Sequence, residues 1–252
     1  MSENKPQETV RNHFNSLANI YDAKAENRKK YLTAIDNLII NHLKNKEQEN
    51  QDNLVILDVG CGTGSRVANI ASNLNSATVW GIDVAEQMVR QAEKRINHAC
   101  VQSMTALNLS IKFDAIFCLF NAFGYLATYQ ERLQALRNMR NHIKDGGILF
   151  IDVMNILHKG EGLAFKRTNQ DVIKDIVFPL ITGKGLGNKE FSIKINDEET
   201  AGFVHGFFDF EMGLLLKKSE WFIEQKQVIG YDSGNIKQKN SQGQLFYICR
   251  KK

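Results

Sequence analysis

The sequence predicts an α/β fold built on a mostly parallel β-sheet, and three observations lead to this prediction. Short runs rich in β-branched residues alternate with stretches in which apolar residues recur every three or four positions. Three alternating glycines stand where the first of these runs turns into a helical stretch. A chain of 252 residues, 43% of them hydrophobic, has enough length for one large domain with a small addition.

The first part of the chain is expected to contain five strands, at 54–59, 78–83, 99–102, 113–120 and 147–153. Helical periodicity after the first, second and fourth strands indicates right-handed crossovers between parallel strands. Two amphipathic helices are expected before the first strand, because apolar residues recur at helical spacing from Val10 to Tyr21 and from Leu32 to Leu43. The polar stretch 44–53 predicts a solvated connection.

The second part of the chain follows a different pattern. From 155 to 206, glycine-rich breaks surround one run with strict alternation at 191–195, which predicts an insertion with its own small antiparallel piece. We expect this insertion to cap the edge of the sheet. A helix at 210–219 and strands at 221–229 and 244–249 are expected to complete the core.

Charge and composition argue against several classes of protein. The net charge of +4 comes from basic and acidic residues that are interleaved along the chain, so we expect no nucleic-acid partner. Residues 1–12 lack the apolar core of a signal peptide, and no apolar run is long enough to cross a bilayer. A cytoplasmic protein without a membrane partner, either monomer or dimer, is therefore expected. The cysteines form no Cys-x-x-Cys pair and are expected to be reduced thiols.

The run from Val55 to Gly64 carries the strongest indication of chemistry. Glycines at a junction between strand and helix let backbone N–H groups approach a ligand closely, because no Cβ stands in the way. The third glycine comes one residue earlier than in the dinucleotide-binding pattern. The negative charge of the Asp58 carboxylate would repel a pyrophosphate, but it would attract a ligand that carries an ammonium and a sulfonium. Asp83, at the end of the second strand, is placed to accept ribose hydroxyls or, alternatively, to cap the next helix.

The runs Leu57-Asp-Val-Gly-Cys-Gly-Thr-Gly64 and Gly81-Ile-Asp-Val-Ala-Glu-Gln-Met88 resemble the first two motifs of class I S-adenosylmethionine (SAM)-dependent methyltransferases. The resemblance continues through 113–120, through 143–150, where Asp145 replaces the usual proline, and through 244–251. It implies a seven-stranded, Rossmann-like methyltransferase sheet whose last strand is antiparallel. It also implies an enzyme that uses SAM as its cofactor, bound across the carboxyl ends of the first strands.

The same resemblance implies a division of the chain into four parts. These are an N-terminal helical lid segment (1–50), a SAM-binding core (51–154), the cap insertion (155–206) and a C-terminal part of the core (207–252). We expect the lid segment and the cap insertion to form the pocket for the methyl acceptor.

Residues of the cofactor site are implied by the family's motifs. In this family the acidic residue of the first motif, here Asp58, helps to bind the methionine moiety, and Asp83 holds the ribose. The third strand usually ends in an aspartate beside the adenine, but 103–105 here contain none, so we expect backbone groups with Met88 and Met104 to contact the ring. The residues expected at the cofactor are Tyr21, Asp58, Gly60, Cys61, Gly62, Gly64, Asp83, Val84, Met88, Ser103, Met104, Thr105 and Leu119.

The stretch after the fourth strand, Asn121-Ala-Phe-Gly-Tyr125, bears on the identity of the methyl acceptor. It differs from the Asn-Pro-Pro-Tyr of enzymes that methylate amino groups of nucleic-acid bases or of protein glutamine. It also lacks the aspartate that metal-dependent catechol-type enzymes place here, so no metal is expected. Asn121 and Tyr125 are candidate substrate-binding residues, with a core position as the alternative for Tyr125.

Two further residues are candidates for a catalytic role. The phrase from Phe14 to Asp22 is similar to the opening of quinone C-methyltransferases, in which this segment closes over the cofactor. Tyr21 is therefore a candidate lid residue at the reacting groups, with helix packing as the alternative. His205 is a candidate base for an acceptor hydroxyl, with a structural histidine as the alternative.

The sequence thus predicts the transfer of a methyl group from SAM to nitrogen or oxygen of a small molecule. A quinone-type C-methyltransferase and a SAM-binding protein without catalysis are the alternatives, since a glycine loop indicates binding and not turnover. A macromolecular acceptor is disfavoured because no basic stripe is present.

Overall fold

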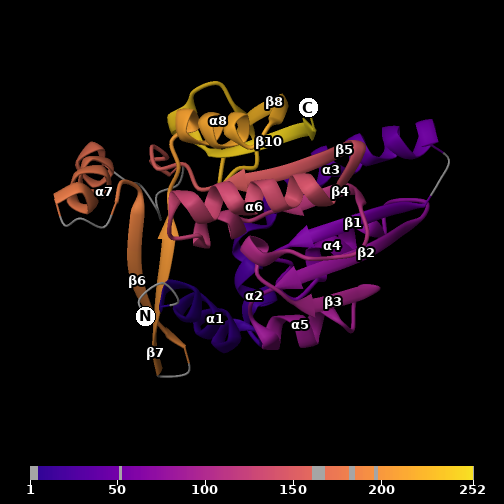
Figure 1. The fold of residues 1–252 in the computed structure, drawn as a ribbon. Coiled ribbons are helices and arrows are strands. Elements are labelled where there is room, and N and C mark those ends of the chain that lie inside the picture. The colour runs from indigo at the N-terminus through magenta and orange to yellow at the C-terminus, as the bar shows by residue number, and fades with distance from the viewer. Residues whose placement is uncertain (1–4, 51–52, 161–167, 182–184, 196–197, 252) are drawn as a thin grey trace.

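The computed structural model describes residues 5–50, 53–160, 168–181, 185–195 and 198–251. Its central sheet consists of β1 (Leu54–Val59), β2 (Ala77–Asp83), β3 (His98–Val101), β4 (Phe113–Cys118), β5 (Ile143–Val153), β8 (Trp221–Ile229), β9 (Ile236–Lys237) and β10 (Gln244–Lys251). These strands lie in the order β3-β2-β1-β4-β5-β10-β8-β9 (Figure 1). The first five are parallel, and β10 is antiparallel to both β5 and β8.

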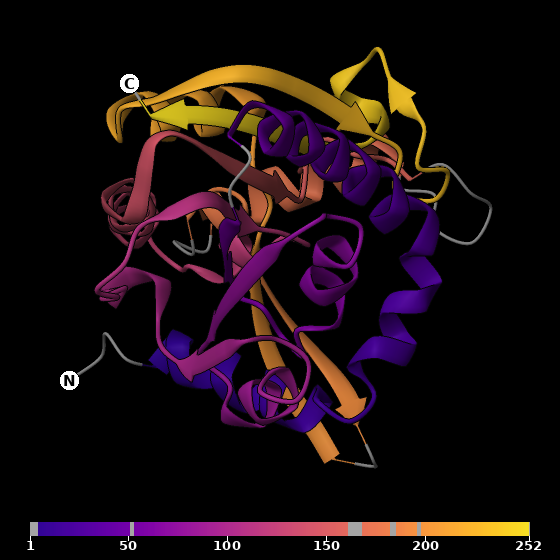
Figure 2. The ribbon, with the colours of Figure 1, turned by 90° about the vertical axis from the view of Figure 1, so that its right-hand side faces the viewer.

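Helices cover both faces of this sheet. The helices α3 (Lys29–Asn50) and α4 (Ser65–Ala71) lie on one face, and α6 (Tyr129–His142) and α8 (Asp209–Lys218) lie on the other (Figures 1 and 2). In β1, Leu54 and Ile56 pack towards α3, whereas Leu57 and Val59 pack towards α6. A strand that is buried on both faces must be apolar at nearly every position, which explains the continuous apolar run there.

The helix α6 shows how local sequence defines an element. Thr128 precedes it and accepts a hydrogen bond from the Glu131 backbone N–H at 3.1 Å, while Glu131 accepts one from the Thr128 backbone N–H at 2.9 Å. This reciprocal cap satisfies two N–H groups that have no partner within the helix. The helix therefore begins directly after the loop that follows β4.

Two segments far apart in the sequence meet outside the central sheet. The N-terminal helices are α1 (Lys5–Leu17), α2 (Tyr21–Ala25) and the 3₁₀ turn η1 (Glu26–Arg28). The insertion contains α7 (Asn169–Ile181) and an antiparallel hairpin of β6 (Asn188–Ile195) and β7 (Glu198–His205). The hairpin lies beside α1 and extends away from the central sheet (Figures 1 and 2).

The α/β class, the mostly parallel sheet and the small antiparallel insertion are confirmed. The two-residue strand β9 extends the seven expected strands to eight. The expected solvated connection at 44–53 is wrong up to Asn50, because Lys, Glu and Gln are good helix formers and α3 continues through them. Glu47 also stabilises this end of α3, since its Oε1 accepts hydrogen bonds from the backbone N–H groups of Asn75 and Ser76 at 2.9 and 3.2 Å. Residues 51–52 lie outside the described residues.

The fourth strand is shorter than predicted. It ends at Cys118 and not at Phe120, because Phe120 and Asn121 have φ angles of 56° and 60°. Left-handed φ angles are unfavourable for residues other than glycine, so other contacts must hold this turn. Neither α7 nor β7 was anticipated as a separate element. No helix within the described ranges combines the length and apolarity that spanning a membrane requires.

Candidate functional site

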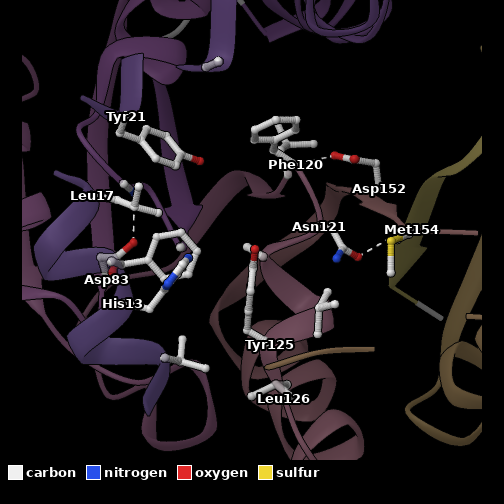
Figure 3. A pocket seen from close by; sticks show the side chains of 18 of the residues that line it. His13, Leu17, Tyr21, Asp83, Phe120, Asn121, Tyr125, Leu126, Asp152 and Met154 are labelled. Atoms are coloured by element: carbon white, nitrogen blue, oxygen red, sulfur yellow. Dashed lines mark hydrogen bonds between the residues drawn. The ribbon is translucent and has the colours of Figure 1, made fainter. Parts of the chain in front are cut away.

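A cavity of about 850 Å³ lies where β1, β2, β4 and β5 end. The walls of this cavity come from α1 and α2, from the loops after these strands and from the hairpin (Figure 3). A volume of this order matches binding sites for small organic ligands. Ten of the residues predicted from the sequence line it: Tyr21, Gly60, Gly62, Asp83, Val84, Ser103, Met104, Leu119, Asn121 and Tyr125.

The loop between β1 and α4 requires its glycines. Gly60, Gly62 and Gly64 have φ angles of 77°, 54° and 74°, in the region that side chains rarely adopt. A Cβ on Gly60 would stand 2.7 Å from the Cβ of Ala122, and one on Gly64 would stand 3.1 Å from Ala92. The loop thus packs closely on two neighbouring elements while Gly60 and Gly62 stay open to the cavity.

Asp83 is fixed at the edge of the cavity by backbone groups. Its Oδ2 accepts a hydrogen bond from Gly62 N at 2.9 Å, and its Oδ1 accepts one from Ala85 N at 2.9 Å. A carboxylate has about four lone-pair positions, so both oxygens can still accept a hydroxyl from a ligand. Burial raises the pKa of this carboxyl, and the backbone N–H groups oppose that rise. The helix α5 (Glu86–Ala92) begins after Ala85 and has no side-chain cap, so Asp83 holds the turn before this helix, does not cap it, and is oriented for a ligand.

Asp58 lies beneath the cavity and does not line it. Its residue is 6% exposed, and burial raises its pKa to about 7. The Arg66 guanidinium opposes this rise, whereas the neighbouring carboxylates of Asp83 and Asp36 add to it. Arg66 is itself held by Asp36 through a contact of 2.7 Å between Nε and Oδ1. Asp58 thus influences the cavity through its charge.

Tyr21 covers the glycine loop from the N-terminal side. A Cβ on Gly62 would lie 3.5 Å from the Tyr21 ring, so the ring rests on the loop backbone. The next residue, Asp22, accepts a hydrogen bond from the Thr63 hydroxyl at 2.6 Å and forms an ion pair with Arg95 at 2.8 Å. These contacts join α2 to the loop and to the turn after α5, and the Tyr21 hydroxyl lies in the cavity (Figure 3).

The left-handed turn after β4 is held by strand β5. Phe120 N donates a hydrogen bond to Asp152 Oδ1 at 2.6 Å, and Met154 N donates one to Asn121 Oδ1 at 2.8 Å (Figure 3). Tyr31 of α3 donates its hydroxyl proton to Asp152 Oδ2 at 2.7 Å. Because a backbone N–H can only donate, the amide oxygen of Asn121 must face Met154. Its NH2 group is consequently directed to the cavity side, where it can donate to a ligand.

Tyr125 lies opposite Tyr21 in the cavity wall. Its ring packs edge-on against Phe14 of α1, with 4.8 Å between ring centroids. Burial raises the pKa of Tyr125 to about 12, so the hydroxyl is neutral and can donate a hydrogen bond at physiological pH. Figure 3 shows the hydroxyls of Tyr21 and Tyr125 pointing into the same space. Of the two alternatives for Tyr125, a position in the cavity wall therefore describes this residue better than a position in the core.

The remaining predicted residues do not line the cavity. They are Asp58, Cys61, Gly64, Met88, Thr105 and His205. Met88 is fully buried and packs with Leu17, Ala18 and Ala85 under α1. In place of Met88, Leu17 of the same cluster reaches the cavity.

His205 is enclosed in a polar cluster at the base of the hairpin. Its residue is 1% exposed, its Nδ1 lies 2.6 Å from Asn188 Oδ1, and its Nε2 lies 3.0 Å from Glu211 Oε1. Arg132 joins the same cluster through hydrogen bonds to Asn188 and to the Leu126 carbonyl. Both ring nitrogens are thus engaged outside the cavity, an arrangement that suits a structural histidine and not a base for the acceptor.

Asp152, Tyr31 and His13 are among the residues that line the cavity but were not predicted from the sequence. Asp152 is the one acidic residue in the buried apolar stretch 147–153 of β5, one residue before the strand ends, and such a residue in a buried strand could have been noticed in the sequence. Tyr31 and His13 lie on amphipathic helices among apolar neighbours, and only the folded structure shows that they face a cavity.

Comparisons with known proteins give the site a context. A family profile described as "Methyltransferase domain" matches residues 56–147. The chain is 29% identical over 99 residues to the dTDP-3-amino-3,4,6-trideoxy-alpha-D-glucopyranose N,N-dimethyltransferase of Streptomyces venezuelae, a match covering 38% of this chain and 41% of that protein. It is 24% identical over 245 residues to the malonyl-[acyl-carrier protein] O-methyltransferase of Acetivibrio thermocellus, covering 90% of this chain and 79% of that protein.

A solved structure agrees with the fold. The S-adenosylmethionine-dependent methyltransferase from Clostridium acetobutylicum superimposes with a TM-score of 0.64 at 18% identity, covering 94% of this chain and 98% of that one. The match to the Streptomyces protein spans about two fifths of its length, and the family profile covers the glycine loop.

Proposed function

Because the chain belongs to the class I SAM-dependent methyltransferases, we propose that it transfers a methyl group from SAM to nitrogen or oxygen of a small-molecule acceptor. One observation carries this proposal. A single cavity joins the glycine loop and Asp83 to a second wall that contains Asn121 and Tyr125. A volume of about 850 Å³ accommodates a cofactor together with a small acceptor.

The residues around the glycine loop fit SAM. The positive φ angles of Gly60 and Gly62 leave an open cradle that a Cβ would fill, and Asp83 retains acceptor positions for ribose hydroxyls. Asp58 and Asp152 place negative charge next to a cavity that would hold a cationic ligand. Ser103 and Met104 lie where we propose the adenine binds, with Val84 and Leu119 beside it.

SAM supplies a methyl group on a positively charged sulfur, and the chain's own residues hold the two reactants. Tyr21 covers the cofactor end, and its hydroxyl is un-ionised because burial raises its pKa. The amide NH2 of Asn121 and the hydroxyl of Tyr125 are proposed to hold the acceptor. The helix α1 and the hairpin line the far side of the cavity. Holding two reactants in line supplies much of the rate in such displacements, roughly 7 to 11 kcal/mol in favourable cases.

Two relatives act on different acceptors, one on the amino group of a sugar nucleotide and one on a carrier-bound malonyl group. The proposal is tested with SAM labelled in its methyl group, incubated with each of these compound types, with glycine and with a fractionated metabolite extract. Label in a small-molecule fraction is the expected result. Tight binding of SAM without transfer to any fraction would reject the enzyme in favour of a SAM-binding protein without catalysis.

The affinity for SAM is expected to fall as the pH is lowered from 8 to 6. Asp58, with a pKa raised to about 7 by burial, then takes up a proton and no longer attracts the sulfonium. S-adenosylhomocysteine lacks that charge, so its affinity should change less. Calorimetry at several pH values measures both ligands. In the variant Asp58→Asn, the affinities for SAM and for S-adenosylhomocysteine should depend on pH to the same extent. If SAM still shows the stronger pH dependence in this variant, the effect belongs to another group.

The same carboxyl affects stability in the opposite sense. The folded protein binds a proton on Asp58 up to about pH 7, whereas the unfolded chain releases it near the ordinary value of 3.8. The contribution of Asp58 to stability is therefore present at low pH and is lost as the pH rises through 7. In the ligand-free protein at pH 8, Asp58→Asn should consequently increase the melting temperature while it weakens SAM binding.

A further inference from the structure

His13 combines features that a packing residue does not need. Its residue is 3% exposed, yet it lines the cavity and projects from α1 towards the space that the Tyr125 hydroxyl enters (Figure 3). Among the described residues, none lies within hydrogen-bond distance of its buried Nδ1. Buried polar groups in folded proteins are nearly always satisfied, so an unpaired ring nitrogen at a cavity points to a group that the cavity receives.

The surroundings of His13 place it on the acceptor side of the cavity. Its ring packs edge-on against Phe14, at 5.2 Å between centroids, and against Phe191 of the hairpin, at 5.3 Å. Phe14 in turn contacts Tyr125 at 4.8 Å. The glycine loop is covered by Tyr21, which lies two turns further along the chain. His13 thus belongs to the wall formed by α1 and the hairpin and not to the cofactor end.

The position of the imidazole is fixed by the anchoring of α1. Asn15 Oδ1 accepts a hydrogen bond from Gln87 N at 2.9 Å, and the Ala18 carbonyl accepts one from Gln91 Nε2 at 2.9 Å. At the other end of the helix, Gln7 donates to Glu131 at 3.0 Å. These contacts join α1 to α5 and α6, so the ring is held in place before a ligand binds.

The imidazole is uncharged at neutral pH. Burial lowers the pKa of His13, and the ammonium of Lys24 lowers it further. Three ionisable groups on the neighbouring elements are engaged or neutral. Lys189 is paired with Asp175, Glu131 is bonded to Gln7, and Tyr125 is un-ionised. A neutral imidazole has one nitrogen with a free lone pair, which can accept a proton.

We propose that His13 contacts the methyl acceptor and takes the proton that the methylated nitrogen or oxygen gives up. This inference rests on the proposed methyl transfer. The acceptor atom forms a bond to the methyl carbon, the bond from that carbon to sulfur breaks, and its electron pair stays on sulfur as a thioether. The proton of the acceptor N–H or O–H moves to the imidazole and leaves to water when the product departs. The acceptor is accordingly a primary or secondary amine or a hydroxyl compound, and not a carbon acid.

The test compares His13→Phe and His13→Gln with wild type and with a control variant, His98→Gln, at an exposed histidine on β3 outside the cavity. Affinity for S-adenosylhomocysteine, measured by calorimetry, should change less than about twofold in all variants. Transfer of labelled methyl groups to the acceptor fraction should fall roughly hundredfold or more in His13→Phe, the usual effect of losing a general base. At saturating SAM, where the protonation of Asp58 no longer limits binding, the wild-type rate should also fall at low pH with the titration of one imidazole, and this dependence should disappear in His13→Gln.

A packing role predicts the opposite pattern, because phenylalanine fits an aromatic cluster with Phe14 and Phe191. Full turnover in His13→Phe with an unchanged pH profile would therefore overturn the inference while leaving the methyltransferase proposal intact. A second measurement does not depend on turnover. Proton NMR titration of the histidine ring signals, assigned with the His13 variants, should show a neutral imidazole at pH 7, and a protonated one there would also overturn it. Absence of transfer in the wild type would reject the proposed function itself, and this inference with it.

Discussion

Replacing Asp83 with alanine is expected to weaken the binding of SAM by about one hundredfold. Hydrogen bonds to a charged partner contribute about 1.5 to 3 kcal/mol each, and a factor of one hundred corresponds to about 2.7 kcal/mol. The side chain also accepts hydrogen bonds from Gly62 and Ala85, so the loop loses part of its orientation as well. Calorimetric titration with SAM and with S-adenosylhomocysteine measures the change.

Two further variants separate ribose binding from a general loss of structure. Asp83→Asn keeps one acceptor oxygen and should retain more affinity than alanine does. Asp114→Ala removes a carboxylate that also accepts a backbone hydrogen bond from β1, through Val55 N at 3.0 Å, but that lies outside the cavity. Its SAM affinity should equal that of the wild type. If Asp83→Ala binds SAM as tightly as wild type does, the assignment of this residue to the ribose is wrong.

Replacing Asp152 with alanine is expected to lower the free energy of unfolding by about 3 kcal/mol. Asp152 is 2% exposed and accepts hydrogen bonds from Tyr31 and from Phe120 N. Each buried donor left without an acceptor costs about 1 to 3 kcal/mol, and the left-handed turn at Phe120 loses the contact that holds it. Urea denaturation measures the loss, and an unchanged m-value shows that the folded state is otherwise preserved.

The matched variant Tyr31→Phe removes one of these two hydrogen bonds and leaves the carboxylate in place. It should cost about 1 kcal/mol, clearly less than Asp152→Ala. Equal losses in the two variants would mean that the bond from Phe120 contributes nothing to the turn. A loss below 1 kcal/mol in Asp152→Ala would show that the turn does not depend on the Asp152 carboxylate.

The part of the cavity around the glycine loop was predictable because its determinants are local. Gly60, Gly62 and Asp83 act through backbone geometry at the ends of two adjacent strands, and that geometry follows from residues next to them in the sequence. Asp58 was recognised by its motif, but its burial beneath the cavity depends on α3 and α4, which the motif does not contain. Its charge was predictable, whereas its raised pKa was not.

The acceptor half depends on contacts between distant segments. His13 reaches the cavity only because the hairpin places Phe191 against α1, and the periodicity of either segment alone shows no partner for it. The same limitation explains why the sequence suggested His205 as a base for the acceptor. Asn188 from the start of β6 and Glu211 from α8 engage both of its ring nitrogens, and the two residues approach it only through tertiary packing.

The arrangement of α1 against the β6–β7 hairpin has an evolutionary consequence. Neither segment contributes a residue to the glycine loop, so exchanges at positions such as Val10 or Val204 alter the room for one reactant without direct contact with the binding determinants of the other. Effects at sites without shared neighbours add nearly independently. If this wall holds the acceptor as proposed, point changes in it would let related chains take different acceptors while the glycine loop stays unchanged.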